Sequence, residues 1–125
     1  MPGLGELFFN EGARQYNAGI EAQNNTDTLA AQKSFGMSVE AFEQAYNIYT
    51  QAGINDTTTI FYVSIAAELA GDYDKAKAKL NQLIEMQYPK SGVYSSLANI
   101  YYEKDKDVEK AMQVYALGRE RFPTT

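Results

Sequence analysis

A motif recurs at a fixed interval in the second half of the chain, and this repetition constrains the fold more than any other feature. Residues 71–76 (Gly-Asp-Tyr-Asp-Lys-Ala) begin an apolar run that ends at Pro89, and residues 107–111 (Asp-Val-Glu-Lys-Ala) begin a similar run that ends at Pro123. The two prolines are 34 residues apart. A period of about 34 residues is typical of a repeated helix–turn–helix unit. The sequence is therefore predicted to form a helical repeat.

Apolar side chains recur at steps of three and four residues, which gives each predicted helix one apolar face. Examples are Ile60, Val63, Ala67 and Ala70, and later Val93, Leu97, Ile100 and Tyr101. Segments rich in Gly, Asn, Asp and Pro separate these runs. The pattern predicts six helices, over 5–23, 27–51, 57–70, 73–87, 91–104 and 107–121. Oxygen-bearing side chains that could cap their first turns are Asp56 or Thr57, Asp72 and Ser91.

The spacing of aromatic and small residues resembles the signature of the tetratricopeptide repeat family, in which W-x2-L-G-x2-Y precedes A-x3-F and then proline. The last repeat has Tyr94, Leu97, Ala98, Tyr101, Ala111, Tyr115 and Pro123 at these positions. The middle repeat has Ile60, Val63, Ser64, Ala67, Ala76, Leu80 and Pro89. The first repeat is less regular and has Phe9, Gly12, Ala13, Tyr16, Ser38 and Phe42. The resemblance covers nearly the whole chain and is closest to bacterial repeat proteins.

This resemblance implies an all-α fold, a right-handed superhelix of antiparallel helix pairs. One domain is expected over 1–125, with repeats over about 5–52, 57–89 and 91–123. Small residues would let neighbouring helices approach closely, namely Ala13, Ser64, Ala76, Ala98 and Ala111. The first repeat carries an insertion of 13 residues relative to the middle repeat. The insertion either lengthens the first helix pair or forms a protruding arm for a partner or a second copy.

Composition argues against several classes of function. The chain has neither His nor Cys, so thiol chemistry, imidazole bases, disulfides and Cys/His zinc sites are excluded. Its formal charge of −5 disfavours nucleic acid as a partner. We therefore expect no enzyme, no cofactor and no metal site. The carboxylates occupy positions typical of solvated helix faces, at Glu40, Glu43, Glu85, Glu103, Glu109 and Glu120.

Membrane insertion is not expected, because no apolar stretch approaches the roughly 20 residues of a membrane span. The first residues lack the basic-then-apolar pattern of a signal peptide. The expected location is the cytoplasm by default, or the periplasm or exterior if a signal has been trimmed.

Binding to a protein or peptide is the function that the resemblance implies, through first-helix residues that line a concave groove. The corresponding positions are Asn10, Arg14, Asn17, Phe61, Ile65, Glu68, Ser95, Asn99 and Tyr102. Core packing between repeats is an equally good interpretation of Phe61, Tyr62 and Ile65. The basic clamp with which some family members hold acidic chaperone tails is not matched, because only Arg14 is basic among Asn10, Arg14, Tyr62, Gly92 and Ser96.

The last predicted helix has an apolar face without an obvious cover, at Val108, Met112, Tyr115 and Leu117. An exposed face of this kind predicts self-association, a partner, or a longer parent protein. Three functions therefore stay open. The first is an interaction module that also forms homo-oligomers through Val108, Met112 and Tyr115. The second is a fragment of a larger exported multi-repeat protein, and the least favoured is a small-ligand binder or enzyme.

Overall fold

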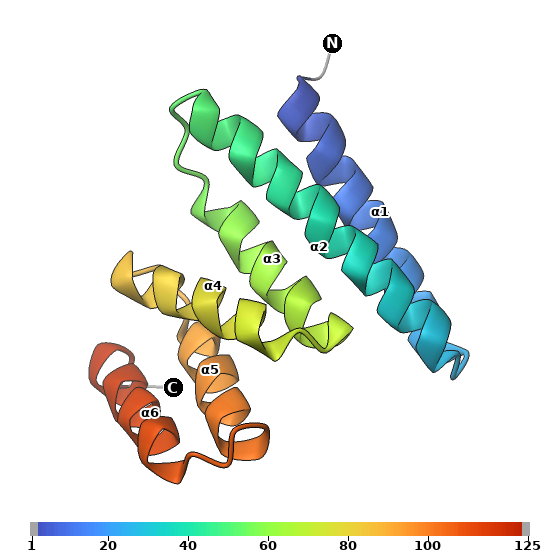
Figure 1. Ribbon diagram of the computed structural model, residues 1–125. Helices are drawn as coiled ribbons and strands as arrows, with labels where there is room; N and C mark the ends of the chain where they lie inside the picture. The colour runs from blue at the N-terminus through green and yellow to red at the C-terminus, as the bar shows by residue number, and fades with distance from the viewer. Residues whose placement is uncertain (1–2, 124–125) are drawn as a thin grey trace. The chain divides into compact units, whose positions relative to one another are not determined.

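A computed structural model describes residues 3–123 of the chain. Within this range the chain forms six helices and no strand, which confirms the predicted all-α class. The predicted helix bounds differ from the observed ones by at most two residues. The helices are α1 (Leu4–Asn24), α2 (Thr28–Gln51), α3 (Thr57–Ala70), α4 (Tyr73–Glu85), α5 (Ser91–Glu103) and α6 (Val108–Arg121), as labelled in Figure 1.

Aspartate side chains cap four of these helices. A carboxylate oxygen accepts a hydrogen bond from the backbone N–H three residues later at Asp27, Asp56, Asp72 and Asp107. This confirms the predicted caps at Asp56 and Asp72, because these oxygens satisfy first-turn N–H groups that lack a partner within the helix. The predicted cap at Ser91 is wrong. Ser91 is already the first helical residue, and Lys90, with extended backbone, precedes the helix without a side-chain cap.

The described chain divides into two compact units, with the boundary between Ala76 and Lys77 in α4. The first unit contains α1, α2, α3 and the first turn of α4. The second contains the rest of α4, then α5 and α6. One domain over 1–125 stays a prediction, and residues 1–2 and 124–125 lie outside the described range.

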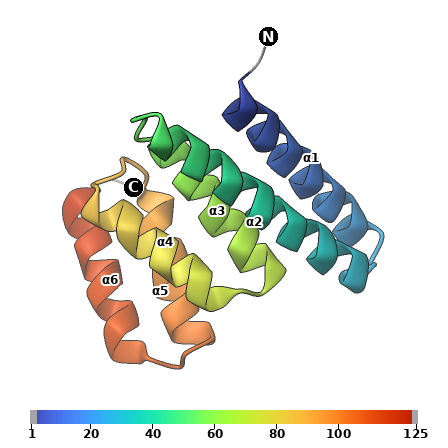
Figure 2. The ribbon, with the colours of Figure 1, turned by 45° about the horizontal axis from the view of Figure 1, so that its top comes forward.

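In the first unit, α1 and α2 lie side by side (Figures 1 and 2) and their contact depends on glycine. Glycines follow one another at seven-residue steps in α1, and aromatic rings do the same in α2. The facing pairs are Gly5 with Tyr49, Gly12 with Phe42, and Gly19 with Phe35. A methyl group on Gly12 would lie 2.6 Å from the Phe42 ring. Since real side-chain carbons do not come this close, glycine is needed for each ring to rest on the α1 backbone.

These three contacts extend along both helices and fix their antiparallel register. Between them, the Ser38 hydroxyl donates a buried hydrogen bond of 2.7 Å to the Gly12 carbonyl. Five residues on one face of α2 are buried, namely Ala31, Phe35, Ser38, Phe42 and Ala45. Tyr49 is half-buried, and Ala52 is exposed because α2 ends before it. The inserted residues therefore lengthen an ordinary helix pair and do not form a separate arm.

The rest of the first unit is built on α2. Helix α3 packs against it, and its buried residues are Thr59, Ile60, Val63, Ser64, Ala66 and Ala67. Lys75, in the first turn of α4, donates to the Glu43 carboxylate of α2 over 2.7 Å. Both side chains are about one-third exposed, so this ion pair contributes little to the stability of the unit. Its main effect is to position the turn.

The second unit pairs α5 with α6. Its fully buried residues include Leu80, Leu83, Val93, Leu97 and Ala98. A methyl group on Gly118 would lie 2.8 Å from the Tyr94 Cβ. This short distance shows that the α5 and α6 backbones come close at this point. Neither Gly118 nor the Tyr94 Cβ can move aside without moving its helix. Of the small residues predicted to lie between helices, Ala98 and Ala111 are buried in this unit.

Candidate functional site

A groove of about 580 Å³ lies between α5 and α6 in the second unit. This volume falls within the roughly 300–1,000 Å³ of ligand-sized pockets. The α5 side contributes Ala98, Asn99 and Tyr102. The α6 side contributes Val108, Ala111, Met112, Tyr115, Ala116 and Arg119. We call these nine residues the α5/α6 groove.

Large apolar side chains in the groove are open to solvent. Tyr102 is 58% exposed, Met112 67% and Tyr115 54%, while Ala98 and Ala111 are buried beneath them. Scattered exposed apolar residues are normal on a protein surface, but a contiguous group in a hollow indicates an interaction site.

Contacts at both ends of the helix pair hold the groove in shape. At one end, the turn before α6 is held by the Asp107 cap and by a 2.6 Å ion pair between Lys77 and Asp105. At the other end, Gly118 lies against Tyr94. The Tyr94 hydroxyl accepts a hydrogen bond of 2.5 Å from the Arg121 guanidinium, which also donates to the Ile84 carbonyl. None of these contacts involves the exposed side chains of the groove. The shape of the groove therefore does not depend on those exposed side chains.

Arg119 is the single charged residue that lines the groove. It is exposed, and it makes no hydrogen bond or ion pair with any residue in the described range. Arg121, two residues later, is engaged with Tyr94 and Ile84. The groove therefore combines apolar walls with one cation that is available to an incoming carboxylate.

The structure brings together two sets of residues that the sequence analysis assigned to different roles. Asn99 and Tyr102 were predicted for partner binding, and Val108, Met112 and Tyr115 for self-association. All five line the α5/α6 groove. Ser95 is exposed on α5 and lines a smaller neighbouring hollow with Tyr115 and Arg119. Leu117, also predicted to lack cover, is half-buried and is not among the lining residues.

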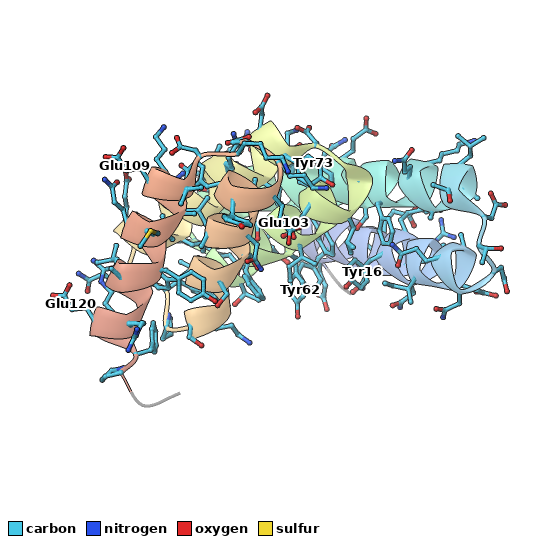
Figure 3. The ribbon with its side chains drawn as sticks, turned by 90° about the horizontal axis from the view of Figure 1, so that it is seen from below. Tyr16, Tyr62, Tyr73, Glu103, Glu109 and Glu120 are labelled. Carbon is cyan, nitrogen blue, oxygen red and sulfur yellow. The ribbon has the colours of Figure 1, made fainter. Side chains whose placement is uncertain are left out.

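The first unit has a smaller hollow of about 200 Å³. It is lined by Phe9, Ala13, Tyr16, Asn17, Phe42 and Tyr62. The Phe42 and Tyr62 rings stack with centroids 5.5 Å apart, and the Phe9 ring meets both edge-on. Tyr16 and Tyr62 project from the same side of the unit (Figure 3). Of the predicted binding residues, only Asn17 reaches this hollow.

The other predicted α1 residues, Asn10 and Arg14, are exposed. Arg14 does form a two-pronged contact with a carboxylate, but that carboxylate belongs to its own helix. Its guanidinium donates to the two oxygens of Glu11 over 2.8 and 2.7 Å. A ligand carboxylate would therefore have to displace Glu11, so Arg14 is less available than its sequence position indicates.

The Arg14 hydrogen bonds, with a further one from the Gln15 amide, lower the pKa of Glu11 to about 2. This pKa is lower than the value of roughly 4.3 expected for a glutamate in the unfolded chain. The Glu11–Arg14 pair therefore makes its full contribution to the stability of the fold above about pH 4.3. Its contribution is lost as the pH falls through about 2.

We expect Arg14→Met to move the pKa of Glu11 toward about 4.3, measured by the pH dependence of its NMR side-chain carboxyl shift. Arg119→Met is the control and should leave this pKa unchanged, and an unchanged pKa in Arg14→Met would contradict the assignment.

On α3, the predicted binding residues Phe61, Ile65 and Glu68 are all half-buried. Their neighbour Tyr62 is 38% exposed, although its ring packs on Phe42 and Phe9. Half-burial is compatible with both interpretations, surface recognition and packing, so each stays open at these positions. The predicted groove residues thus form two sets, one in each unit.

Among residues 3–123, no three acidic, Cys or His side chains converge as a metal site would require. Five of the six carboxylates predicted on solvated faces are exposed, and the sixth, Glu43, is half-buried against Lys75. None of the helices formed by the described residues has the length and apolar character needed to cross a bilayer.

Comparison with known protein families, with curated proteins and with solved structures finds no match to this chain.

Sequence reasoning did not identify Arg119, Ala98, Ala111 or Ala116 as part of a binding surface. A signal was nevertheless present, because Val108, Met112, Tyr115 and Arg119 are spaced by four, three and four residues. This spacing places them on one face of a helix. Because Arg119 is charged, a pattern made of apolar side chains alone does not include it.

Proposed function

We propose that this chain is a non-catalytic protein-interaction module of the tetratricopeptide repeat type, which binds a helical segment of a partner in the α5/α6 groove. The observation that supports this is the contiguous exposure of Tyr102, Met112 and Tyr115 in a hollow of about 580 Å³. The right-handed superhelix implied by the repeat resemblance belongs to the same proposal.

The repeat pattern indicates that a helix is the fitting occupant. Tyr115 lies 35 residues after Leu80, and Ala111 lies 35 residues after Ala76. Leu80 is 2% exposed, whereas Tyr115 is 54% exposed. In a repeat array, a position on the second helix of one repeat is covered by the helix that follows. The last repeat presents the same surface to solvent, and an amphipathic helix would bury it.

The polar groups of the groove add selectivity to this apolar contact. Asn99 can donate to and accept from polar groups at the edge of a bound helix. Arg119 can form a two-pronged contact with a carboxylate. Tyr102 and Tyr115 offer rigid rings with hydroxyl groups, the kind of side chain enriched at binding hot spots. A partner helix with one apolar face and an acidic residue at one end would match this arrangement.

The test is affinity capture from a lysate of the source organism, comparing the wild type with a Tyr102→Ala, Met112→Glu double variant. Both residues are more than half exposed, so the double variant should fold. We expect partner binding to weaken at least about tenfold, because truncation of a hot-spot residue alone costs this much or more. A matched control is Asn47→Ala, on the exposed side of α2. Equal capture by the wild type and the folded double variant would refute the groove as the binding site.

A further inference from the structure

We infer that α6 of a second copy of this chain fills the α5/α6 groove, in antiparallel orientation to the first α6. This inference rests on the proposed function, because it uses the same groove and names the occupant. The resulting contact is self-complementary, as in the two-fold symmetric interfaces that most homodimers use.

The exposed face of α6 has the spacing of a helix–helix seam. Val108, Met112, Tyr115 and Arg119 follow one another at intervals of four, three and four residues. This is the spacing of the a and d positions of a coiled coil, where each side chain packs into a hole on the facing helix. In the antiparallel arrangement, Met112 faces Tyr115 of the second copy and Val108 faces its Arg119.

Charge decides the orientation of the two helices. Glu109 and Arg119 lie near opposite ends of α6, are exposed, and have no partner among the described residues. Figure 3 shows Glu109 at one end of the helix and Glu120, next to Arg119 in the sequence, at the other. Antiparallel pairing brings Glu109 beside Arg119 of the second copy, twice in the dimer. Parallel pairing would instead place like charges together.

Three other charged groups near the ends of α6 are already engaged within the second unit. Asp105 pairs with Lys77 over 2.6 Å. Lys110 lies over the Tyr101 ring at 5.6 Å, and Arg121 donates to Tyr94. Glu120 is also exposed and has no partner among the described residues, but it directly follows Arg119 and therefore lies off the seam. Glu109 and Arg119 are thus the unpaired charges at the apolar seam, and antiparallel pairing satisfies both. This complementarity within one helix favours a second copy over an unrelated partner.

The outer face of α1 is a weaker candidate for a contact between copies. Leu4 and Leu7 are exposed there, at 61% and 52%. The next residues on that face are Glu11 and Arg14, which form an exposed ion pair. Covering this pair would remove both charges from water, a cost that their attraction does not reliably offset. A contact through α6 requires no such desolvation of a formed pair.

Sedimentation equilibrium of the full chain over a range of concentrations tests the inference. The wild type should form dimers, and Glu109→Arg or Arg119→Glu alone should weaken dimerisation at least about tenfold, because each creates two like-charge contacts per dimer. An equimolar mixture of these two variants should regain dimers, since opposite charges face each other again in the heterodimer. The double variant should regain them as well. Wild type that stays monomeric at a few hundred micromolar, or a mixture that regains nothing, would overturn the inference.

Cysteine pairing tests the register, because the natural chain contains no cysteine. A mixture of Met112→Cys and Tyr115→Cys chains should form a mixed disulfide under mild oxidation. Met112→Cys alone should form far less, since antiparallel pairing does not bring two copies of position 112 together. Cross-linking of Met112→Cys to itself at the same rate would indicate parallel pairing and contradict the inference.

The two proposals fail in different ways. A monomeric wild type whose Tyr102→Ala, Met112→Glu variant loses a captured protein would refute self-pairing and leave the groove as a site for another partner. The other outcome is that neither dimerisation nor capture changes when these residues are substituted: Tyr102, Glu109, Met112 and Arg119. That outcome would refute both proposals.

Discussion

Gly12→Leu should lower the free energy of unfolding of the first unit by about 3 kcal/mol or more, because the new side chain has no space in a packed interface. Even a methyl group at this position would lie within 2.8 Å of three atoms of the Phe42 ring. Phe42 cannot move away easily, since it is 2% exposed and packs on Phe9 and Tyr62. Chemical denaturation followed by circular dichroism would measure the change.

Gly36→Ala is the matched control for this prediction. Gly36 also lies within a helix, but nothing lies within 4 Å of a methyl group built on it. Alanine should therefore stabilise α2 by about 0.5–1 kcal/mol, the difference in helix propensity from glycine. The milder Gly12→Ala variant should be partly rescued by Phe42→Leu, which removes the opposing ring. A Gly12→Leu protein that unfolds at the wild-type denaturant concentration would show that α1 and α2 do not pack through glycine.

Leu97→Ala should destabilise the second unit by about 2–5 kcal/mol, the usual cost of truncating a large buried aliphatic residue. Leu97 is completely buried. Met112→Ala removes a side chain of similar size, but Met112 is 67% exposed. For the monomer we expect Met112→Ala to change the free energy of unfolding by no more than about 0.5 kcal/mol.

Denaturation of both variants at low protein concentration separates folding from association. A large loss of stability in monomeric Met112→Ala would mean that this side chain belongs to the core, and the groove would then lose its main exposed residue. A small loss in Leu97→Ala would contradict the observed core of the α5/α6 pair. The expected result, a large effect for Leu97 and a small one for Met112, would show that the exposed face of α6 is not needed for folding.

The helices could be predicted from the sequence because their signals are local. Apolar residues at steps of three and four residues, with Gly, Asn, Asp or Pro between the runs, placed all six helices within two residues of their bounds. The caps at Asp56 and Asp72 were found in the same way. Ser91 was misplaced because capping requires non-helical backbone at that residue, and Lys90 has it instead. The side chain alone does not reveal which of two neighbours adopts it.

The glycines of α1 show where local reasoning stops. Gly5, Gly12 and Gly19 are evenly spaced in the sequence, but within a helix glycine simply lowers helix propensity. Their role depends on rings that lie far along the chain. Phe42, for instance, is 30 residues from the glycine that it covers. Only the packing of α2 against α1 shows that these glycines are needed.

The sequence by itself determined the helical class and the helix bounds, because both follow from residues close together in the chain. It also identified Val108, Met112 and Tyr115 as an apolar face without a cover. Only the tertiary structure decided that Asn99 and Tyr102 join this face in one groove, that Arg119 has no partner there among the described residues, and that Arg14 is held by Glu11. The physical reason is that exposure and charge pairing depend on which neighbours surround a side chain. Leu80 and Tyr115 are 35 residues apart in the sequence, and one is buried while the other is open to solvent.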